Sequence, residues 1–180
     1  MIMEQNTDEL KYPIGRFEKP EAFTPELKRE WIAVLANLPS WMDACIENLD
    51  EAQLHVPYRD GGWTIQQVIH HLADSHMNAY IRLKLALTED NPAIKTYDEK
   101  AWALLADNAQ PVNISITLLH ALHRRLVSLL QQLTEADWER TFYHPDRKRN
   151  VTVWETAGLY AWHSRHHTAH IRGLKERMGW

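Results

Sequence analysis

Four long stretches of this chain carry apolar side chains at the spacing of an amphipathic helix, and this pattern constrains the fold more than any other feature. Two of the stretches open with a capping box, Thr64 with Gln67 and Thr152 with Glu155. Runs of alternating apolar and polar residues, typical of strands, are almost absent. The pattern therefore predicts an all-α four-helix bundle. The expected helices span residues 24–49, 64–88, 111–133 and 152–177.

The connections predict how these helices are arranged. Residues 89–110 are too many for a tight turn, so the second and third helices are expected to run parallel, in up-down-down-up order. Pro39 removes a backbone donor within the first helix and predicts a kink or a break there. Residues 1–23 contain prolines and a glycine without helical periodicity, which favours an extended N-terminal arm. We expect a single domain over residues 1–180, with short helical turns at 50–54, 97–107 and 134–138.

Composition excludes several classes of partner. The formal net charge is −4 and the sequence pI is about 6.2, so the chain has no overall positive charge to hold a nucleic acid or an anionic membrane. No stretch approaches the ~18 apolar residues of a membrane span. A single cysteine, Cys45, cannot form an internal disulfide, and the first residues lack a secretory signal. These features favour a cytoplasmic protein with neither nucleic-acid nor membrane partners.

Histidine is the unusual component, with 11 residues of this type. Four of them fall within eight residues of the last helix, where His163 and His167 lie one turn apart and face the bundle interior. The second helix offers a third nitrogen from His70, His71 or His76, and periodicity leaves open which of His71 and His76 is used. A lone histidine on an apolar face is usually a hydrogen-bonded core residue. Three imidazoles without partners would cost ~1–3 kcal/mol for each unmet group, whereas one cation would satisfy all three, so we expect a metal site.

Six runs of residues, spread over nearly the whole chain, are similar to one known family. These runs are YPIG (12–15), PYRDGGWT (57–64), HHLADSHMNAYIRLKLALTED (70–90), YDEKAW (97–102), FYHP (142–145) and LYAWHSRHH (159–167). They resemble the YfiT family of metal-dependent hydrolases, which is part of the DinB-like superfamily. The resemblance implies a four-helix bundle in up-down-down-up order, a homodimer and a divalent ion, zinc or nickel, held by three histidines.

The resemblance also implies which histidines bind the ion. The family's ligand on the second helix matches the second histidine of HHLAD, which is His71, and its closing H-x-x-x-H pair matches His163 and His167. A glutamine is common in the superfamily at the position of His170, so the resemblance gives that residue no direct ligand role. The residues expected to support the ligands or to line a substrate cleft are His76, Asn78, Arg82, His166 and His170.

Three neutral ligands leave the ion its full charge and an open position, which is typical of a catalytic site. A bound water would then ionise near pH 7, and a substrate thiol would be held as the thiolate. Hydrolysis usually also needs a carboxylate as general base, and the position that carries it in zincins is Ser164 here. Asp74, Asp98 and Glu155 are other candidate bases, although no spacing places them at the site.

Three functions are therefore compatible with the sequence. The first is a metal-dependent hydrolase that activates water against a small molecule. The second is transfer of a low-molecular-weight thiol to an electrophile, which needs no base because a thiol has a pKa of ~8.5; several DinB-like proteins are similar in acting as bacillithiol-type S-transferases. The third is a non-enzymatic metal-binding module, which three ligands without a fourth make less typical.

Overall fold

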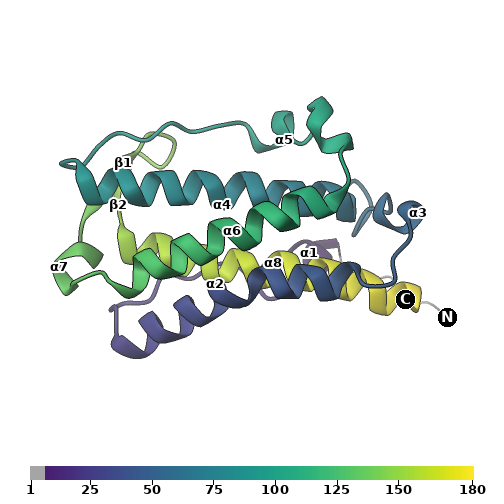
Figure 1. The fold of residues 1–180 in the computed structure, drawn as a ribbon, viewed down its shortest axis with the longest axis horizontal. Coiled ribbons are helices and arrows are strands. Elements are labelled where there is room, and N and C mark those ends of the chain that lie inside the picture. The colour runs from purple at the N-terminus through teal and green to yellow at the C-terminus, as the bar shows by residue number, and fades with distance from the viewer. Residues whose placement is uncertain (1–6) are drawn as a thin grey trace.

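Four long helices pack side by side in the computed structural model, which describes residues 7–180 (Figure 1). They are α2 (Pro25–Ile46), α4 (Ile65–Thr88), α6 (Val112–Gln131) and α8 (Val153–Met178). Helix α2 packs against α6 and α8, and α4 packs against the same two helices. The predicted all-α four-helix bundle is confirmed, with each helix close to its expected range.

The helices follow the predicted up-down-down-up order. In Figure 1, α4 and α6 run in the same direction, and α2 and α8 run in the opposite one. The segment between α4 and α6 returns along the length of α4, so α6 begins near the end of the bundle where α4 begins (Figure 1). This crossing segment contains the short helix α5 (Glu99–Trp102) and the single turn η1 (Ala106–Ala109). Side-chain bonds from Gln67 to the Ala103 carbonyl and from Gln66 to the Asn108 carbonyl hold it against α4.

The predicted capping boxes form to different extents. Thr64 and Gln67 make both bonds of the box at the start of α4. At the start of α8, Thr152 accepts a bond from the Glu155 amide, but the Glu155 carboxylate binds the guanidinium of Arg149 instead of returning to the cap. The second box is therefore only half formed, and the sequence prediction was wrong in this detail because an ion pair takes its acid.

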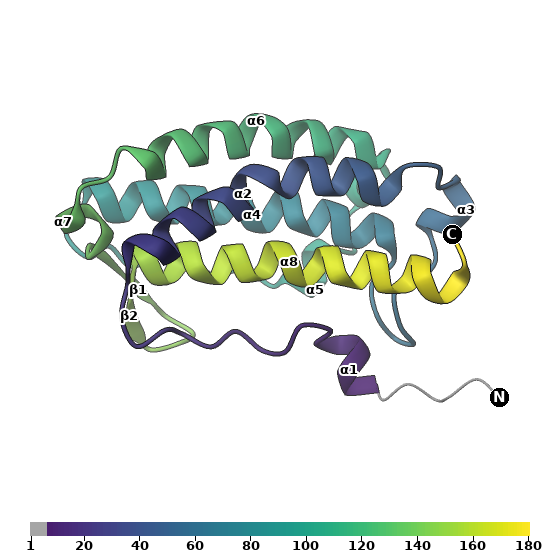
Figure 2. The same ribbon diagram turned by 90° about the horizontal axis from the view of Figure 1, so that it is seen from below.

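Pro39 lies inside α2 without breaking it, and Figure 2 shows α2 as one helix that bends along its course. Proline has no N–H, so the Leu35 carbonyl one turn earlier has no helical donor. The imidazole of His123 on α6 fills this place, with Nδ1 2.6 Å from the Leu35 oxygen. A bond that the helix loses is thus replaced by a contact across the bundle. Of the two predicted outcomes at Pro39, the structure shows a bend and not a break.

Two elements of the structure differ from the sequence prediction. The N-terminal arm contains the short helix α1 (Thr7–Lys11) and is extended only after it, while residues 1–6 of the arm lie outside the described residues. A β-hairpin precedes α8, with β1 (Thr141–His144) antiparallel to β2 (Arg149–Thr152). Its pairing of Phe142 with Val151 buries both side chains. One buried pair is too short a pattern to indicate strands.

The remaining short elements agree with the sequence. The expected turns at 50–54 and 134–138 are the helices α3 (Glu51–Leu54) and α7 (Glu135–Trp138), each opened by a complete capping box. Among the described residues, no helix is both long and apolar enough to cross a membrane.

The core consists of two apolar clusters separated by histidines. The cluster beside the hairpin includes Trp31, Leu35, Leu83, Leu126, Leu130, Trp138 and Trp154, and the cluster at the other end includes Leu38, Met42, Ile65, Ile69, Leu72, Leu119 and Ile171. Along α4, α6 and α8, the buried His76, His123 and the half-buried His163 fall between the residues of these two clusters. The polar residues of the candidate site therefore lie in the middle of the bundle rather than at its end.

Candidate metal centre

Three histidines from two helices converge in this middle layer. His71 comes from α4, and His163 and His167 come from successive turns of α8. The Nε2 atom of His163 lies 3.1 Å from Nε2 of His71 and 3.1 Å from Nε2 of His167. One ligand atom from each residue can be chosen so that all three lie within 4.8 Å of one another. This arrangement brings together the three histidines that the sequence singled out.

The environment keeps these imidazoles neutral, which is the form that binds a metal. Burial lowers the pKa of His71 to about 4, and burial together with the neighbouring histidines lowers the pKa values of His163 and His167 well below the usual range. If all three Nε2 atoms keep their lone pairs unprotonated, a single divalent ion would accept all three at once. Three imidazole nitrogens suit zinc, nickel and related divalent ions, so the donor set fits the ion that the sequence predicts.

His76 lies behind this group rather than within it. Its Nε2 is 3.2 Å from Nδ1 of His163, the nitrogen that faces away from the other two histidines. Periodicity alone left both His71 and His76 open as the third nitrogen. The structure places His71 at the convergence point and His76 against the back of a histidine that is already there.

His170 contacts His167 from behind in a similar way. Its Nε2 lies 3.1 Å from the Lys11 carbonyl, to which it can only donate, so its Nδ1 is an acceptor for the neutral ring. That Nδ1 is 3.3 Å from Nδ1 of His167. The Nδ1–H of His167 therefore donates to His170, and Nε2 of His167 is left with a free lone pair. The tautomer of one candidate ligand is thus set by the N-terminal arm.

The other histidines of the two motifs have separate roles. His166 stacks on Trp162, with ring centroids 4.4 Å apart, and lines the pocket beside the group without joining it. His70 bonds to Ser115 and to the Gln110 carbonyl on the far side of α4. Neither side chain contributes a nitrogen to the convergence point.

Two pockets flank the histidine group, and His163 lines both. The first has a volume of about 590 Å³ and is also lined by the other two histidines. The second has a volume of about 250 Å³ and extends toward the β-hairpin. Arg82 lines this second pocket, as expected for a cleft residue. Asn78 is not among the residues that line either pocket, and its side-chain amide bonds back to the Asp74 carbonyl.

The carboxylates proposed from the sequence are not placed at the centre. Asp98 caps α5 by accepting bonds from two backbone amides, and Glu155 binds Arg149. Asp74 lines neither pocket, and burial together with Asp107 raises its pKa. Ser164, at the zincin position, donates to the Tyr160 carbonyl.

Glu99, which the sequence analysis missed, lines both pockets and is the only carboxylate among the described residues that line the larger one. It begins α5 in the crossing segment, directly after Asp98. Its motif YDEKAW lies in one of the six runs that resemble the family, which is the signal that could have identified it. Only the path of the crossing segment shows that Glu99, rather than Asp98, faces the histidines' pockets.

Comparison with known proteins agrees with this architecture. The family model described as the DinB superfamily matches residues 34–171, a stretch that contains all three converging histidines. The chain belongs to the DinB superfamily. No part of the DinB match includes the N-terminal arm, although Lys11 of the arm contacts the centre through His170.

Individual DinB relatives match over almost the whole chain. A Bacillus subtilis protein named "Putative metal-dependent hydrolase YfiT" is 52% identical over 173 residues, which cover 95% of this chain and 97% of that protein. A Bacillus mycoides protein named "Putative metal-dependent hydrolase BcerKBAB4_2443" is 50% identical over 172 residues, covering 96% and 99%. A solved structure described as "YfiT from Bacillus subtilis is a probable metal-dependent hydrolase with an unusual four-helix bundle topology" superimposes with a TM-score of 0.93 at 51% identity, over 96% of this chain and 99% of that one.

Proposed function

We propose that this DinB-superfamily protein is a metal-dependent hydrolase of a small molecule, with one divalent ion bound by His71, His163 and His167. The observation that carries the proposal is the convergence of three neutral Nε2 atoms beside two pockets. The names of the Bacillus relatives support the same class of activity. Zinc is the expected ion and nickel the alternative, because both accept three imidazoles and keep an open position.

Such an ion supplies a Lewis acid that favours the deprotonated form of a water or thiol ligand. The protein's own residues supply the remaining functions. Glu99, which lines both pockets, would accept the proton from the attacking water. Arg82 and Arg147 line the smaller pocket and would bind an anionic group of the substrate there.

Thiol S-transfer is the second candidate, and the charge of the larger pocket favours it. Lys11, Arg59 and Lys100 line this pocket together with the histidines. Low-molecular-weight thiols commonly carry carboxylates, which these cations would attract. A thiol also loses its proton without a protein base, so this reaction would not need Glu99.

The two reactions are separated by incubating the zinc-loaded protein with the electrophile monochlorobimane, with and without bacillithiol, and with the ester p-nitrophenyl acetate. Ester hydrolysis that needs no thiol and falls strongly in Glu99→Gln supports the hydrolase. Conjugate formed only with thiol, at a rate that Glu99→Gln leaves unchanged, supports the transferase and removes the hydrolase proposal. Glu135→Gln, which changes an acid at the start of α7, is the matched control.

A purely structural metal site is the third possibility, and it makes a different prediction. Chelation would then unfold the protein, and the bound ion would have no open coordination position. The apolar clusters on both sides of the histidine layer argue against it, because they give the bundle a core without any ion.

We also propose a cytoplasmic homodimer. Leu104, Leu105, Ile114 and Leu118 are exposed apolar residues of the crossing segment and of α6, and such residues are common in contacts between subunits. Light scattering of the purified protein measures the oligomeric state, and Leu118→Glu is expected to shift a dimer toward monomer.

A further inference from the structure

One residue from each long helix contributes to a row of polar groups across the bundle. It begins at His163 on α8, whose Nδ1 lies 3.2 Å from Nε2 of His76 on α4. The ring of His76 lies beside that of His123 on α6, with centroids 4.8 Å apart. The row ends at the Leu35 carbonyl on α2, 2.6 Å from Nδ1 of His123. The two middle residues, His76 and His123, are not among the three candidate metal ligands.

The far end of this row has a fixed tautomer. A carbonyl oxygen only accepts, so His123 must carry its proton on Nδ1 in order to bond to Leu35. Burial lowers the pKa of His123 to about 4, so the ring is neutral near pH 7. Its Nε2 is therefore a bare acceptor. The Leu35 carbonyl is available for this contact because Pro39, one turn later, has no N–H to offer it.

The other end of the row, at His163, requires His76 to act as a donor toward His123. Once Nε2 of His163 presents its lone pair to a cation with His71 and His167, the proton of the neutral His163 ring is on Nδ1. That N–H donates to Nε2 of His76, so the proton of His76 must be on its own Nδ1. His76 therefore points a donor away from the metal centre.

The remaining atoms of the row form a matching donor and acceptor. His76 Nδ1 and His123 Nε2 are both buried and, among the described residues, have no hydrogen-bond partner. They belong to adjacent rings, and the two ends of the row make one a donor and the other an acceptor. Leaving both unpaired would cost ~1–3 kcal/mol each, so this polarity favours their pairing directly or through a small adjustment of the rings.

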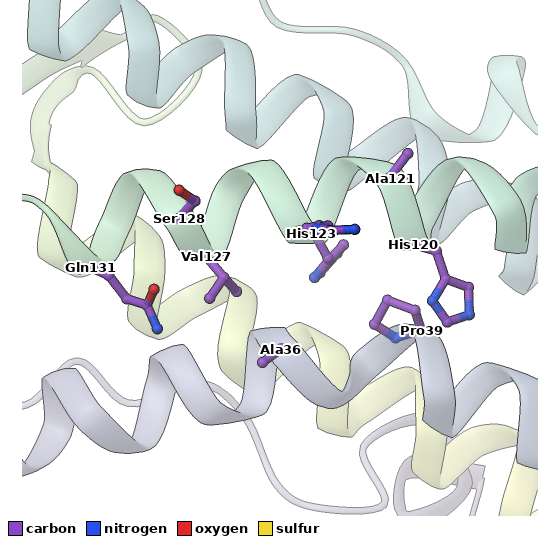
Figure 3. A pocket seen from close by; sticks show the side chains of 9 residues that line it. Ala36, Pro39, His120, Ala121, His123, Val127, Ser128 and Gln131 are labelled. Atoms are coloured by element: carbon purple, nitrogen blue, oxygen red, sulfur yellow. The ribbon is translucent and has the colours of Figure 1, made fainter.

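We propose that His76 and His123 are positioning residues. The Leu35 carbonyl sets the tautomer of His123, which sets that of His76, and His76 in turn fixes the tautomer and ring orientation of His163, so that its Nε2 faces the metal. The inference rests on the proposed metal site and extends it to two residues outside the ligand set. Figure 3 shows His123 and Pro39 on facing helices, α6 and α2. Both residues line a pocket with a volume of about 630 Å³. None of the three candidate ligands lines that pocket, so this end of the row can be changed without touching them.

Zinc affinity, measured by competition with a chromophoric chelator, tests the proposal. Replacing a residue that orients a metal-ligating histidine typically weakens binding about 10- to 100-fold, which is the loss expected for His76→Leu. His123→Leu should cause a smaller loss, because it acts through His76. His76→Gln keeps an oxygen acceptor for the Nδ1–H of His163 and should recover part of the affinity. His120→Ala is the matched control, since this exposed residue lines the same pocket and pairs with Asp43.

A spectroscopic measurement on the unmodified chain covers the case in which a variant fails to fold. Ring ¹⁵N shifts of the zinc-loaded, histidine-labelled protein report the tautomer of each imidazole. We expect His163, His76 and His123 all to carry their protons on Nδ1. In His123→Leu, the signal of His76 should lose this single tautomer.

Different results would overturn different claims. Failure of the unmodified protein to bind zinc or nickel would remove the proposed function itself. Normal zinc binding with an Nε2-protonated His76, or with His76→Leu binding within twofold of the unmodified protein, would remove only the positioning role.

Discussion

The Nε2 atoms of His71 and His163 lie 3.1 Å apart, although the two residues are 92 positions apart in the chain. In the tautomer inferred above for His163, with its proton on Nδ1 toward His76, its Nε2 has no proton to donate to His71. A third Nε2, from His167, points at the same place. The bundle therefore holds three imidazole nitrogens together in advance of any ion, which reduces the cost of ordering ligands on binding.

Replacing one of these rings should abolish stable metal binding. His71→Ala removes the nitrogen that α4 contributes to the three-histidine group, and the two remaining imidazoles on successive turns of α8 are a weak site. For the unmodified protein, zinc at one hundred times its Kd should add about 2.7 kcal/mol to the free energy of unfolding, whereas the variant should gain almost nothing. Thermal unfolding with and without zinc, together with elemental analysis after dialysis, measures both effects. Equal stabilisation of the two proteins would contradict the ligand assignment.

The metal-free protein should lose stability in mild acid. His123 has a pKa of about 4 when folded because it is buried, compared with 6.5 in the unfolded chain, so between these values only the unfolded state takes up the proton. The contribution of His123 to the free energy of unfolding is thus fully present above about pH 6.5 and is lost progressively as the pH falls toward 4. Each buried imidazole with a pKa lowered in this way should reduce the free energy of unfolding by on the order of 1 kcal/mol at pH 5.5, compared with pH 7.5. Urea unfolding at pH 7.5 and 5.5 measures this loss, and His123→Phe should show a smaller one; no pH dependence would refute the argument.

Glu155 should act in stability and not in catalysis. Its side chain is only 3% exposed and binds Arg149, with Lys19 at 3.6 Å. Burial alone would raise the pKa of this carboxyl, but Arg149 and the neighbouring cations hold it below its usual range.

Glu155→Gln should therefore lower the free energy of unfolding by about 1–3 kcal/mol while kcat per folded molecule is unchanged. Chemical denaturation and a steady-state assay provide the two measurements. Glu176→Gln, an exposed position of α8, is the control. A large fall in kcat without loss of stability would return Glu155 to the list of candidate bases.

Gly158 allows α8 to approach α2 closely. A Cβ at this position would lie 2.8 Å from Cζ2 and 2.9 Å from Cη2 of Trp31, so the indole or the helices would have to move. Gly158→Ala should destabilise the protein by about 1–3 kcal/mol despite the better helix propensity of alanine.

Gly173→Ala is the matched substitution on the same helix. Its Cβ would meet only the flexible end of Arg177, at 3.4 Å, so the variant should be neutral or up to about 1 kcal/mol more stable. Thermal melts should show a lower Tm for Gly158→Ala and an unchanged or higher Tm for Gly173→Ala. A Gly158→Ala protein as stable as the unmodified one would show that the contact with Trp31 relaxes at no cost.

The features that the sequence predicts well are those set by neighbouring residues. Helical spacing and the cap at Thr64 depend on residues three or four apart, and the length of residues 89–110 is enough to require a crossing connection. The pair His163 and His167 is visible for the same reason, because one turn of helix brings the two rings together.

The features that the sequence does not reveal depend on contacts between distant segments. His71 and His76 both face the interior of α4, and which of them reaches the convergence point depends on the position of α8 across it. Glu99 becomes a candidate base only because the crossing segment passes beside α8. In the hairpin, only the facing pair Phe142 and Val151 is buried on both strands. One such pair is too short to produce an alternating pattern of apolar and polar residues in the sequence.

The layer of imidazoles between the two apolar clusters also limits how the four helices can align. A slip of α4, α6 or α8 by one turn, about 5.4 Å, would push a histidine into hydrocarbon and take its nitrogens away from their partners. In a bundle with a uniformly apolar interior, shifting one helix along another buries no unpaired polar group, so the register of the helices is less strongly fixed. In this protein, the histidines that form the candidate cation site thus also fix how the helices align along the bundle axis.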